Sequence, residues 1–317
     1  MTISGHLQDL YGLPVFDFPD ADADAEPGSL PDPESVAWRI SVDAYESDEA
    51  WEAAFARFTA AVDTTRVRAL IVGAWSDVYE SAPDEVITAI RDARGELPAL
   101  RALFFGDITY EECEISWINQ TTVTPLLEAF PQLEEFGVRG GTGLGFPAVR
   151  HAALRTLCVE TGGLPAEVVR GIAGSELPAL EHLDLWLGVS AYGGDTELAD
   201  LESFFTGSRL PRLRHLALRN AEIQDEIAAA FASAPVVARL ETLDLSMGTL
   251  GDEGAAALLE GQPLTHLKKL DLNHHFISGP LRARIREALE PAGVTVDLDD
   301  VQEPWDGGDG RFTAVAE

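Results

Sequence analysis

The 317-residue chain is poor in cysteine, with only Cys113 and Cys158, so a disulfide framework is excluded and a reducing compartment is expected. It also lacks any run of eighteen apolar residues, which excludes a membrane-spanning helix. The first residues, Met1–His6, have neither the basic start nor the apolar core of a signal peptide. Together these absences predict a cytoplasmic protein without a membrane partner.

Basic residues are scarce as well, because 22 Lys and Arg stand against 54 Asp and Glu and give a formal charge of −32. Residues 1–35 contain eight acids and no Lys or Arg, residues 297–317 contain seven acids and Arg311, and −18 remains for residues 36–296. Such a field repels phosphate backbones, so no nucleic-acid partner is expected. A basic partner would be favoured, but the presence of only two lysines points more strongly to the composition of a GC-rich bacterial genome.

One sequence pattern occurs eight times between Val67 and Leu272: an apolar residue, two variable residues, then apolar, variable and apolar. The copies begin at Val67, Leu100, Leu133, Leu154, Leu180, Leu213, Leu240 and Leu267. The pattern resembles the LxxLxL core of the leucine-rich repeat, in which each copy supplies one strand. The resemblance implies a right-handed α/β solenoid, a horseshoe with a parallel β-sheet on the concave face and helices on the convex face.

The spacing between copies predicts what lies between the strands. Successive copies start 33, 33, 21, 26, 33, 27 and 27 residues apart. A step of about 26–28 residues accommodates a strand, a helix and two turns, whereas 21 residues leave room only for a short helix or an extended return. We therefore expect an irregular repeat at Gly140–Gly145. Helices are expected over residues 48–62, 84–94, 166–173, 197–205, 222–232, 255–259 and 281–289, and around Pro125.

Four regions are expected: an acidic N-terminal segment with a flexible linker, an N-terminal capping unit, the solenoid, and an acidic C-terminal tail. Their bounds are 1–35, 36–66, 67–298 and 299–317. Asp20–Pro33 alternates Ala and Asp before a Pro-rich stretch, so it is the predicted linker. A strand at 294–298 should close the sheet, and Trp305–Glu317 should be mobile.

Side chains alternate along a strand, so the residues between the leucine positions should point over the concave face. This middle column contains Arg39, Ile71, Phe104, Gly137, Cys158, Asp184, Ala217, Asp244, Asp271 and Asp297. The flanking columns include Arg139, His182, Trp186, His215 and Arg219. The predicted face is therefore small and apolar in its N-terminal third and polar and acidic in its C-terminal half.

The centre of this face is the candidate partner-binding site. It consists of Trp186, Arg219, His182 and His215 with Asp184, Asp244, Asp271 and Arg139, and a second, apolar contact zone of Phe104 and Trp75. A large aromatic residue beside two histidines on an open sheet indicates a protein interface, although Asp in Leu-Asp-Leu is also common on a solvated repeat face. Replacing Trp186 and Arg219 by alanine is expected to leave the fold intact and to weaken partner binding by at least about 2 kcal/mol.

A metal- or thiol-dependent enzyme is the main alternative. Adjacent strands would bring His182, Asp184 and His215 to within roughly 5 Å, which suits a two-histidine, one-carboxylate metal site. Cys158 near His182 is the minimum for an activated thiol. However, the sequence has no HExxH motif and no cysteine cluster, and Gly140–Gly145 lacks the lysine of a phosphate loop. We therefore expect no catalytic residues, no metal and no cofactor.

The whole chain, with Tyr11–Phe18 before the capping unit, resembles an actinobacterial family of leucine-rich-repeat proteins whose genes neighbour radical-SAM and ATP-grasp enzymes. Thr249–Leu259 is similar to the loop and helix of ribonuclease-inhibitor-type repeats. The narrower resemblance implies an accessory protein of a biosynthetic or modification system. The expected function is a non-catalytic protein–protein interaction scaffold, and an acidic inhibitor of a basic enzyme is the third interpretation. Neither the partner nor the oligomeric state has a signal in the sequence.

Overall fold

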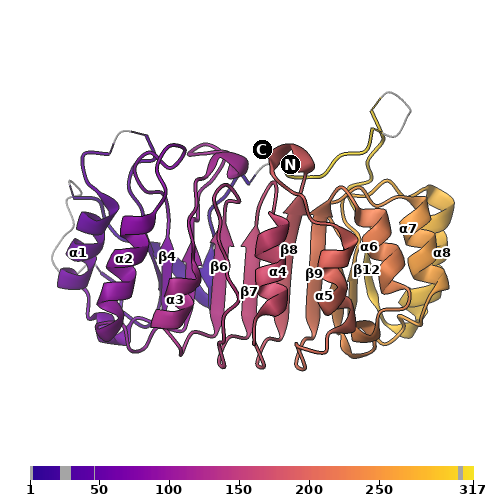
Figure 1. Ribbon diagram of the computed structural model, residues 1–317, viewed down its shortest axis with the longest axis horizontal. Coiled ribbons are helices and arrows are strands. Elements are labelled where there is room, and N and C mark those ends of the chain that lie inside the picture. The colour runs from indigo at the N-terminus through magenta and orange to yellow at the C-terminus, as the bar shows by residue number, and fades with distance from the viewer. Residues whose placement is uncertain (1–2, 22–29, 46, 306–309) are drawn as a thin grey trace.

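The computed structural model describes residues 3–21, 30–45, 47–305 and 310–317. In these residues one sheet of twelve strands follows the order of the chain from β1 to β12. Strand β1 pairs antiparallel with β2, and each later neighbour pair is parallel. Figure 1 shows the helices side by side along one face of the sheet, from the N-terminal end to the C-terminal end. The predicted α/β solenoid with a parallel sheet is confirmed.

The eight copies of the repeated pattern form strands β4 to β11, and the predicted closing strand is β12. The strands are β1 Asp9–Leu10, β2 Leu13–Asp17, β3 Ala37–Ile40, β4 Ala69–Val72, β5 Ala102–Phe105, β6 Glu135–Arg139, β7 Thr156–Glu160, β8 His182–Gly188, β9 His215–Ala221, β10 Thr242–Asp244, β11 Lys269–Asp271 and β12 Thr295–Asp297. The repeats pair in register, so Leu183 lies beside Leu216, which lies beside Leu243. All three side chains are fully buried, which explains why leucine recurs at this position.

Each predicted helix is present, with ends that differ by a few residues. The α-helices are α1 Trp51–Ala61, α2 Asp84–Asp92, α3 Thr124–Ala129, α4 Ala166–Gly174, α5 Glu202–Thr206, α6 Gln224–Phe231, α7 Asp252–Glu260 and α8 Gly279–Leu289. Proline lies at or beside the start of several of them, where a missing backbone N–H costs least. None of the helices in the described ranges is long and apolar enough to cross a membrane.

The repeat between β6 and β7 is irregular, as its short step predicts. Residues 140–155 contain no helix, and the chain returns through isolated bridges that pair Asn119 with Thr142 and Thr122 with Gly145. Gly140 has φ +104°, a left-handed conformation that favours glycine, and a Cβ there would lie 2.7 Å from the Ile118 side chain. The glycine run therefore allows neighbouring loops to approach closely where no helix fits.

The N-terminal segment, defined here as residues 3–17, is part of the sheet and of the packing, which its acidic composition did not predict. Strand β2 pairs with β3, so the sheet begins before the predicted capping unit. The segment also packs over the concave side of β3 to β5 in a second apolar cluster, separate from the main core. Its members are Leu10, Ala37, Ala69, Ile71, Ala102 and Phe104, with Leu7, Tyr11, Leu13 and Val15 partly buried against them. The predicted linker lies mostly outside the described residues, and the boundary at residue 36 stays a prediction.

The C-terminal segment, defined here as residues 310–317, corrects the prediction of a mobile tail. Ala314 and Val315 are only 3% and 2% exposed. Val315 exchanges two hydrogen bonds with the side chain of Asn220, at 2.6 and 3.0 Å. Figure 1 shows that both chain ends lie near the middle of the molecule, on the edge where the loops after the strands meet. Burial of small apolar side chains holds this segment in place. The acidic residues around it in the sequence gave no indication of this burial.

Candidate functional site

The middle column of the concave face is confirmed residue by residue. Arg39 pairs with Ile71, Ile71 with Phe104, and the series continues in register to Asp297. The intervening members are Gly137, Cys158, Asp184, Ala217, Asp244 and Asp271. Trp186 of β8 pairs with Arg219 of β9, so these two candidate residues are direct neighbours. The alternation of the strands therefore places the predicted column correctly.

The Arg219 cluster, formed by Asp184, Trp186, Arg219 and Asp244, is the charged centre of this face. Arg219 donates from Nε to Asp184 Oδ1 at 2.9 Å and from Nη2 to Asp184 Oδ2, and its Nη1 lies 3.7 Å from Asp244 Oδ2. Its guanidinium carbon lies 5.0 Å from the centre of the Trp186 ring. Asp184 and Asp244 are each 6% exposed, so Arg219 is the counter-ion of two buried carboxyl groups.

Burial and charge shift the pKa values of this cluster in opposite directions. Burial raises the pKa of Asp184 and raises that of Asp244 to about 6, while Arg219 partly offsets both increases. Burial alone would lower the pKa of Arg219, but the charge and hydrogen bonds of Asp184 raise it, so the guanidinium stays charged. The Trp186 indole N–H also lowers the pKa of Asp184, although Nε1 makes no hydrogen bond of ordinary geometry with any described residue.

The two candidate histidines stack on each other at the edge of the Arg219 cluster. The rings of His182 and His215 are 3.7 Å apart between centroids and nearly parallel, at 6°. Burial lowers the pKa of both, and the charges of His182, Arg219 and Lys269 lower that of His215 further, to about 3. Both imidazoles are therefore neutral near pH 7 and present a flat, partly exposed surface.

The burial of His215, together with the neighbouring His182, predicts a loss of stability in acid. The unfolded chain takes up a proton on His215 below about pH 6.5, whereas the folded chain does so only near pH 3. Stability is therefore fully present above pH 6.5 and falls as the pH drops towards 3. Between pH 7 and pH 4 the wild type should lose about 3 kcal/mol more free energy of unfolding than His215→Gln does. Urea unfolding at both pH values measures the difference, and His266→Gln, at an exposed position, is the control. Equal losses in wild type and His215→Gln would contradict the prediction.

The same geometry bears on the metal and thiol alternatives. His182 and His215 stack instead of converging on a common point, and Asp184 is already paired with Arg219. Among the residues that the structure describes, no group of three or more His, Cys, Asp or Glu side chains is placed to hold a metal ion. Burial and the charge of Asp184 raise the pKa of Cys158 well above its ordinary value, and its Sγ lies 3.7 Å from Glu160 Oε1. This environment disfavours a thiolate.

Arg139, predicted as a partner-binding residue, is only 3% exposed and lies in a second buried network. Its Nε donates to Glu160 Oε2 at 2.7 Å, and its Nη1 donates to Asp107 Oδ1 at 3.2 Å. Asp107 also accepts from Arg39 Nη1 at 2.9 Å and from the Leu7 backbone N–H at 3.2 Å. Burial alone would raise the pKa of Asp107, but hydrogen bonds and these cations lower it, so the carboxylate is charged. Arg139 and Asp107 thus anchor the N-terminal segment to the sheet.

The structure also corrects the prediction that Phe104 and Trp75 form an apolar contact zone. Trp75 is 3% exposed and belongs to the main core, where its ring lies 5.7 Å from that of Phe105. Phe104 is 4% exposed because the N-terminal segment covers it. Neither side chain is available to a partner in this structure. Asp271, by contrast, is partly exposed and accepts a 2.7 Å hydrogen bond from Lys269.

Two residues that hold these networks together carry little signal in the sequence. Asp107 follows Gly106 after the end of β5, outside the three columns, and no local pattern marks a charged residue as buried. Asn220 follows Arg219 in β9 and is fully buried with a positive φ of 56°. A residue of type Asn in this turn position is a weak signal, since Asn tolerates the left-handed conformation better than most residues.

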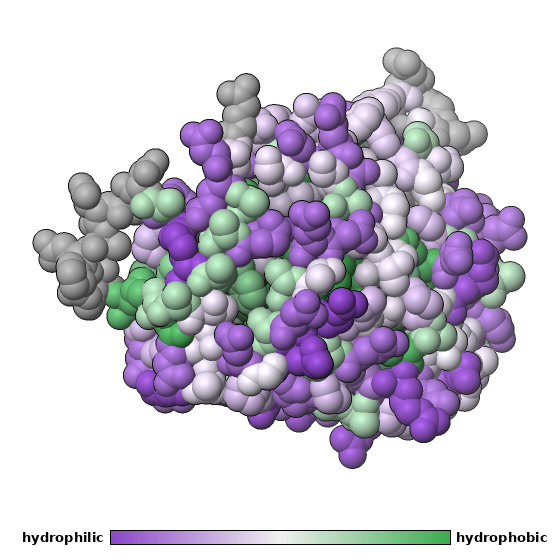
Figure 2. Space-filling model, turned by 60° about the vertical axis from the view of Figure 1, so that its left-hand side comes forward, coloured by the Kyte–Doolittle hydropathy of each residue, from purple (hydrophilic) through white to green (hydrophobic). Residues whose placement is uncertain are grey.

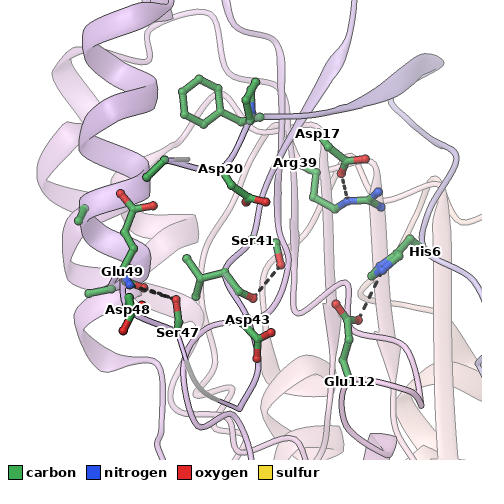
Figure 3. Close-up of a pocket in the computed structure, with 16 residues that line it drawn as sticks. His6, Asp17, Asp20, Arg39, Ser41, Asp43, Ser47, Asp48, Glu49 and Glu112 are labelled. Atoms are coloured by element: carbon green, nitrogen blue, oxygen red, sulfur yellow. Dashed lines mark hydrogen bonds and ion pairs between the residues drawn. The ribbon is translucent and has the colours of Figure 1, made fainter. Parts of the chain in front are cut away.

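The rim, defined here as the edge of the molecule formed by the loops that follow the strands, holds a cavity of about 1070 Å³ at its N-terminal end (Figure 3). The cavity lies among the loops after β2 and β3 and before α1. Its labelled acids are Asp17, Asp20, Asp43, Asp48, Glu49 and Glu112. Three of them are paired internally: Asp17 with Arg39 at 2.6 Å, Glu49 with Arg57 at 2.7 Å, and Glu112 with His6 at 3.5 Å. The cavity is acidic, and cationic side chains lie beside several of its carboxylates.

Exposed aromatic residues lie on the same rim. Tyr45 follows β3, Tyr79 follows β4, and Tyr110 and Trp117 follow β5. The rings of Tyr45 and Tyr79 are 6.3 Å apart between centroids. Figure 2, which brings the N-terminal end forward, shows small apolar areas separated by hydrophilic ones. This face therefore has scattered aromatic anchors without one broad apolar patch.

The repeats are also found by comparison with known proteins. A family model described as leucine-rich repeat matches residues 210–232 and 240–259. A solved structure of a protein from Bacteroides fragilis is 30% identical, with a TM-score of 0.73, over 80% of this chain and 70% of that chain. This chain is a leucine-rich-repeat protein. No curated protein matches this leucine-rich-repeat protein, so its site residues rest on its own geometry.

Proposed function

We propose that this leucine-rich-repeat protein is a non-catalytic, cytoplasmic protein–protein interaction module that binds a partner on the uncovered part of its concave face. One observation carries the proposal. The N-terminal segment covers the concave side of β3 to β5, whereas the centre of the face presents partly exposed polar side chains around a fixed guanidinium. These side chains are His182, His215, Arg219, Lys269 and Asp271.

The rigidity of this centre supports a binding role. Arg219 is held by Asp184 and Trp186, and each histidine is held by the other, so little side-chain entropy is lost when a partner binds. Neutral imidazoles and a charged guanidinium offer hydrogen-bond donors and acceptors next to an aromatic ring. Arginine is also enriched in binding hot spots. Trp186, predicted as the centre of the contact surface, is only 8% exposed, so it supports the Arg219 guanidinium and is not itself a contact residue. The proposed contact surface is therefore the exposed edge of the Arg219 cluster with the stacked histidines.

Two threonines allow a test that spares the buried charges. Thr156 and Thr242 are partly exposed first residues of β7 and β10, beside His182 and His215 in the sheet. Thr156→Arg with Thr242→Arg would place two long side chains over the proposed surface. We expect at least a tenfold loss of partner capture in a pull-down from the native lysate, quantified by mass spectrometry. Thr59→Arg in α1, outside the concave face, is the control.

The outcome separates the interpretations. Equal capture by wild type, the double variant and the control would place the partner surface elsewhere. Stoichiometric metal in the purified protein, lost in His215→Ala, would instead favour the enzyme alternative. Capture that is lost between low and physiological salt, but is the same for wild type, the Thr156→Arg/Thr242→Arg variant and the Thr59→Arg control, would favour a basic partner bound at the acidic cavity.

The acidic cavity supports this second candidate function, in which the chain binds and inhibits a basic enzyme. The proposal rests on the six acidic side chains that line this cavity and on the exposed Tyr45, whose backbone N–H donates to Asp43 at 2.9 Å. The resemblance to the actinobacterial family adds a proposed context, an accessory role beside biosynthetic or modifying enzymes. In both cases the chain would act through a surface and a partner protein.

A further inference from the structure

The C-terminal segment lies in a groove along the rim formed by the loops that follow the strands. This rim groove is lined by Asn220 at the end of β9, Met247 after β10 and His274 after β11, and farther along by Gly162 and Ser116. Figure 1 shows the chain returning along this edge from the C-terminal end to the middle of the molecule. The segment thus crosses the repeats perpendicular to their strands.

The groove is built from a repeated backbone feature. Asn220, Met247 and His274 lie 27 residues apart, at equivalent places in three successive repeats. All three have positive φ, of 56°, 67° and 55°, which is uncommon outside glycine. The left-handed turn bends the chain away after each strand and leaves polar groups along the rim. Backbone strain at three equivalent positions indicates a shared role.

Each of these residues bonds the backbone of the C-terminal segment. The His274 ring has Nε2 3.1 Å from the Phe312 carbonyl oxygen, and the Met247 carbonyl accepts from the Ala314 N–H at 2.7 Å. The two spacings match, because the three residue-to-residue steps from Phe312 to Val315 span about 10 Å when extended, and two strand spacings span about 9.6 Å. An extended chain can therefore meet every repeat.

Asn220 makes the central contact. Its Nδ2 donates to the Val315 carbonyl at 2.6 Å, and its Oδ1 accepts from the Val315 N–H at 3.0 Å. The amide thus copies the pairing that a neighbouring strand would offer. Because both partners are backbone groups, this contact recognises an extended chain whatever its sequence. Asn220 is fully buried, so the pair is shielded from water.

Side-chain contacts add selectivity at both ends. Arg311 donates to Asp225 and to the Thr249 carbonyl, both at 2.7 Å. The Phe312 ring packs 5.4 Å from Phe276 and 4.8 Å from Trp305. Ala314 and Val315 are buried, which limits these places to small or medium apolar side chains.

At the far end the groove is narrow. A Cβ on Gly162 would lie 2.2 Å from the Ala316 carbonyl oxygen, which also accepts from Ser116 Oγ. The glycine is therefore required for a backbone to pass at this point. A chain can enter only in extended form, without a helix.

We propose that the rim groove is a recognition site for an extended segment of a partner protein, in which an arginine and an aromatic residue precede small apolar residues. The C-terminal segment occupies this site as an internal ligand. The inference concerns a second surface, apart from the concave face. A partner is a better occupant than a second copy, because two chains of charge −32 repel each other. A tethered ligand has an effective concentration in the mM range, so a partner must compete with it.

The test uses the full-length chain and a fluorescein-labelled peptide with the sequence of residues 311–317. Val315→Asp should dislodge the C-terminal segment, because a buried carboxylate without a cation is unfavourable. By fluorescence anisotropy, this variant should bind the peptide at least tenfold more tightly than the wild type does. Adding Asn220→Gly, which suits the positive φ but removes the amide, should weaken binding at least tenfold. Peptides that carry Val315→Asp, or Arg311→Ser with Phe312→Ser, should bind more weakly.

Thermal unfolding followed by circular dichroism establishes that each variant is folded. A folded Val315→Asp chain that does not bind the peptide would overturn the proposal, as would binding that Asn220→Gly leaves unchanged. Gly162→Ala in the Val315→Asp background is a second route, and it too should weaken peptide binding. Concentration-dependent dimers of the wild type in light scattering, lost in Val315→Asp, would assign the groove to a second copy and overturn the partner claim.

Discussion

Replacement of Arg219 by alanine is expected to lower the free energy of unfolding by about 3–5 kcal/mol. Asp184 and Asp244 are nearly inaccessible to solvent, and Arg219 is their cationic neighbour on the face. Without it, two buried carboxyl groups must either stay charged without a partner or take up protons. Urea unfolding at pH 7 measures the loss. The effect should shrink below about pH 6, where Asp244 is protonated in the folded chain.

The control is an exposed ion pair between an arginine and a carboxylate. Arg155 pairs with Glu181 at 2.9 Å, and its side chain is 53% exposed. Arg155→Ala should therefore have little effect on the free energy of unfolding, because exposed ion pairs are screened by solvent. A similar small cost for Arg219→Ala would refute the buried-charge argument. The expectation that Trp186 and Arg219 can be replaced together without harm to the fold is corrected, because Arg219 is a structural counter-ion as well as a surface group.

Replacement of Asp107 by alanine is expected to cost about 3–5 kcal/mol and to release the N-terminal segment. Asp107 is fully buried and joins Arg39, Arg139 and the Leu7 N–H. Its loss leaves Arg139 buried with Glu160 as its remaining anion. Hydrogen exchange at the Leu7 amide and proteolysis near Leu10 should both increase. These readouts report the segment directly, independently of global stability.

A matched control again uses an exposed carboxylate. Glu181→Ala removes the partner of Arg155. It should change the free energy of unfolding by less than about 1 kcal/mol and should leave the hydrogen-exchange protection of the N-terminal segment unchanged. If Asp107→Ala destabilises the chain but Leu7 stays protected, the apolar contacts of Leu10 and Tyr11 hold the segment without the ion network.

The strands and helices of the solenoid were predictable because each repeat carries its own local period. The N-terminal and C-terminal segments were not, because their contacts join residues far apart in the chain. Leu7 binds Asp107 across 100 residues, and Val315 binds Asn220 across 95. No pattern within a short window marks such pairs, and the acidic composition around them suggests disorder.

For the candidate site, the face on which each side chain lies was predictable, but its exposure was not. Strand alternation places Asp184, Trp186 and Arg219 on one face, and the sheet register confirms their columns. Exposure does not follow from alternation, since it depends on what covers the face. Phe104 is on the predicted side yet lies beneath the N-terminal segment, while Trp75 turns into the core. The chain's own ends therefore decide which part of the concave face remains open.

The C-terminal segment also changes how the solenoid should unfold. An array of repeats that touch only their neighbours can fray from one end, repeat by repeat. Here Ala316 reaches Ser116, 200 residues away in the chain, and Val315 reaches Asn220 on the way. Loss of the last repeats would break these bonds to the middle ones at the same time. The segment therefore couples distant repeats, so that they unfold as one cooperative unit. The same contacts between residues far apart in the chain raise the contact order, which slows folding.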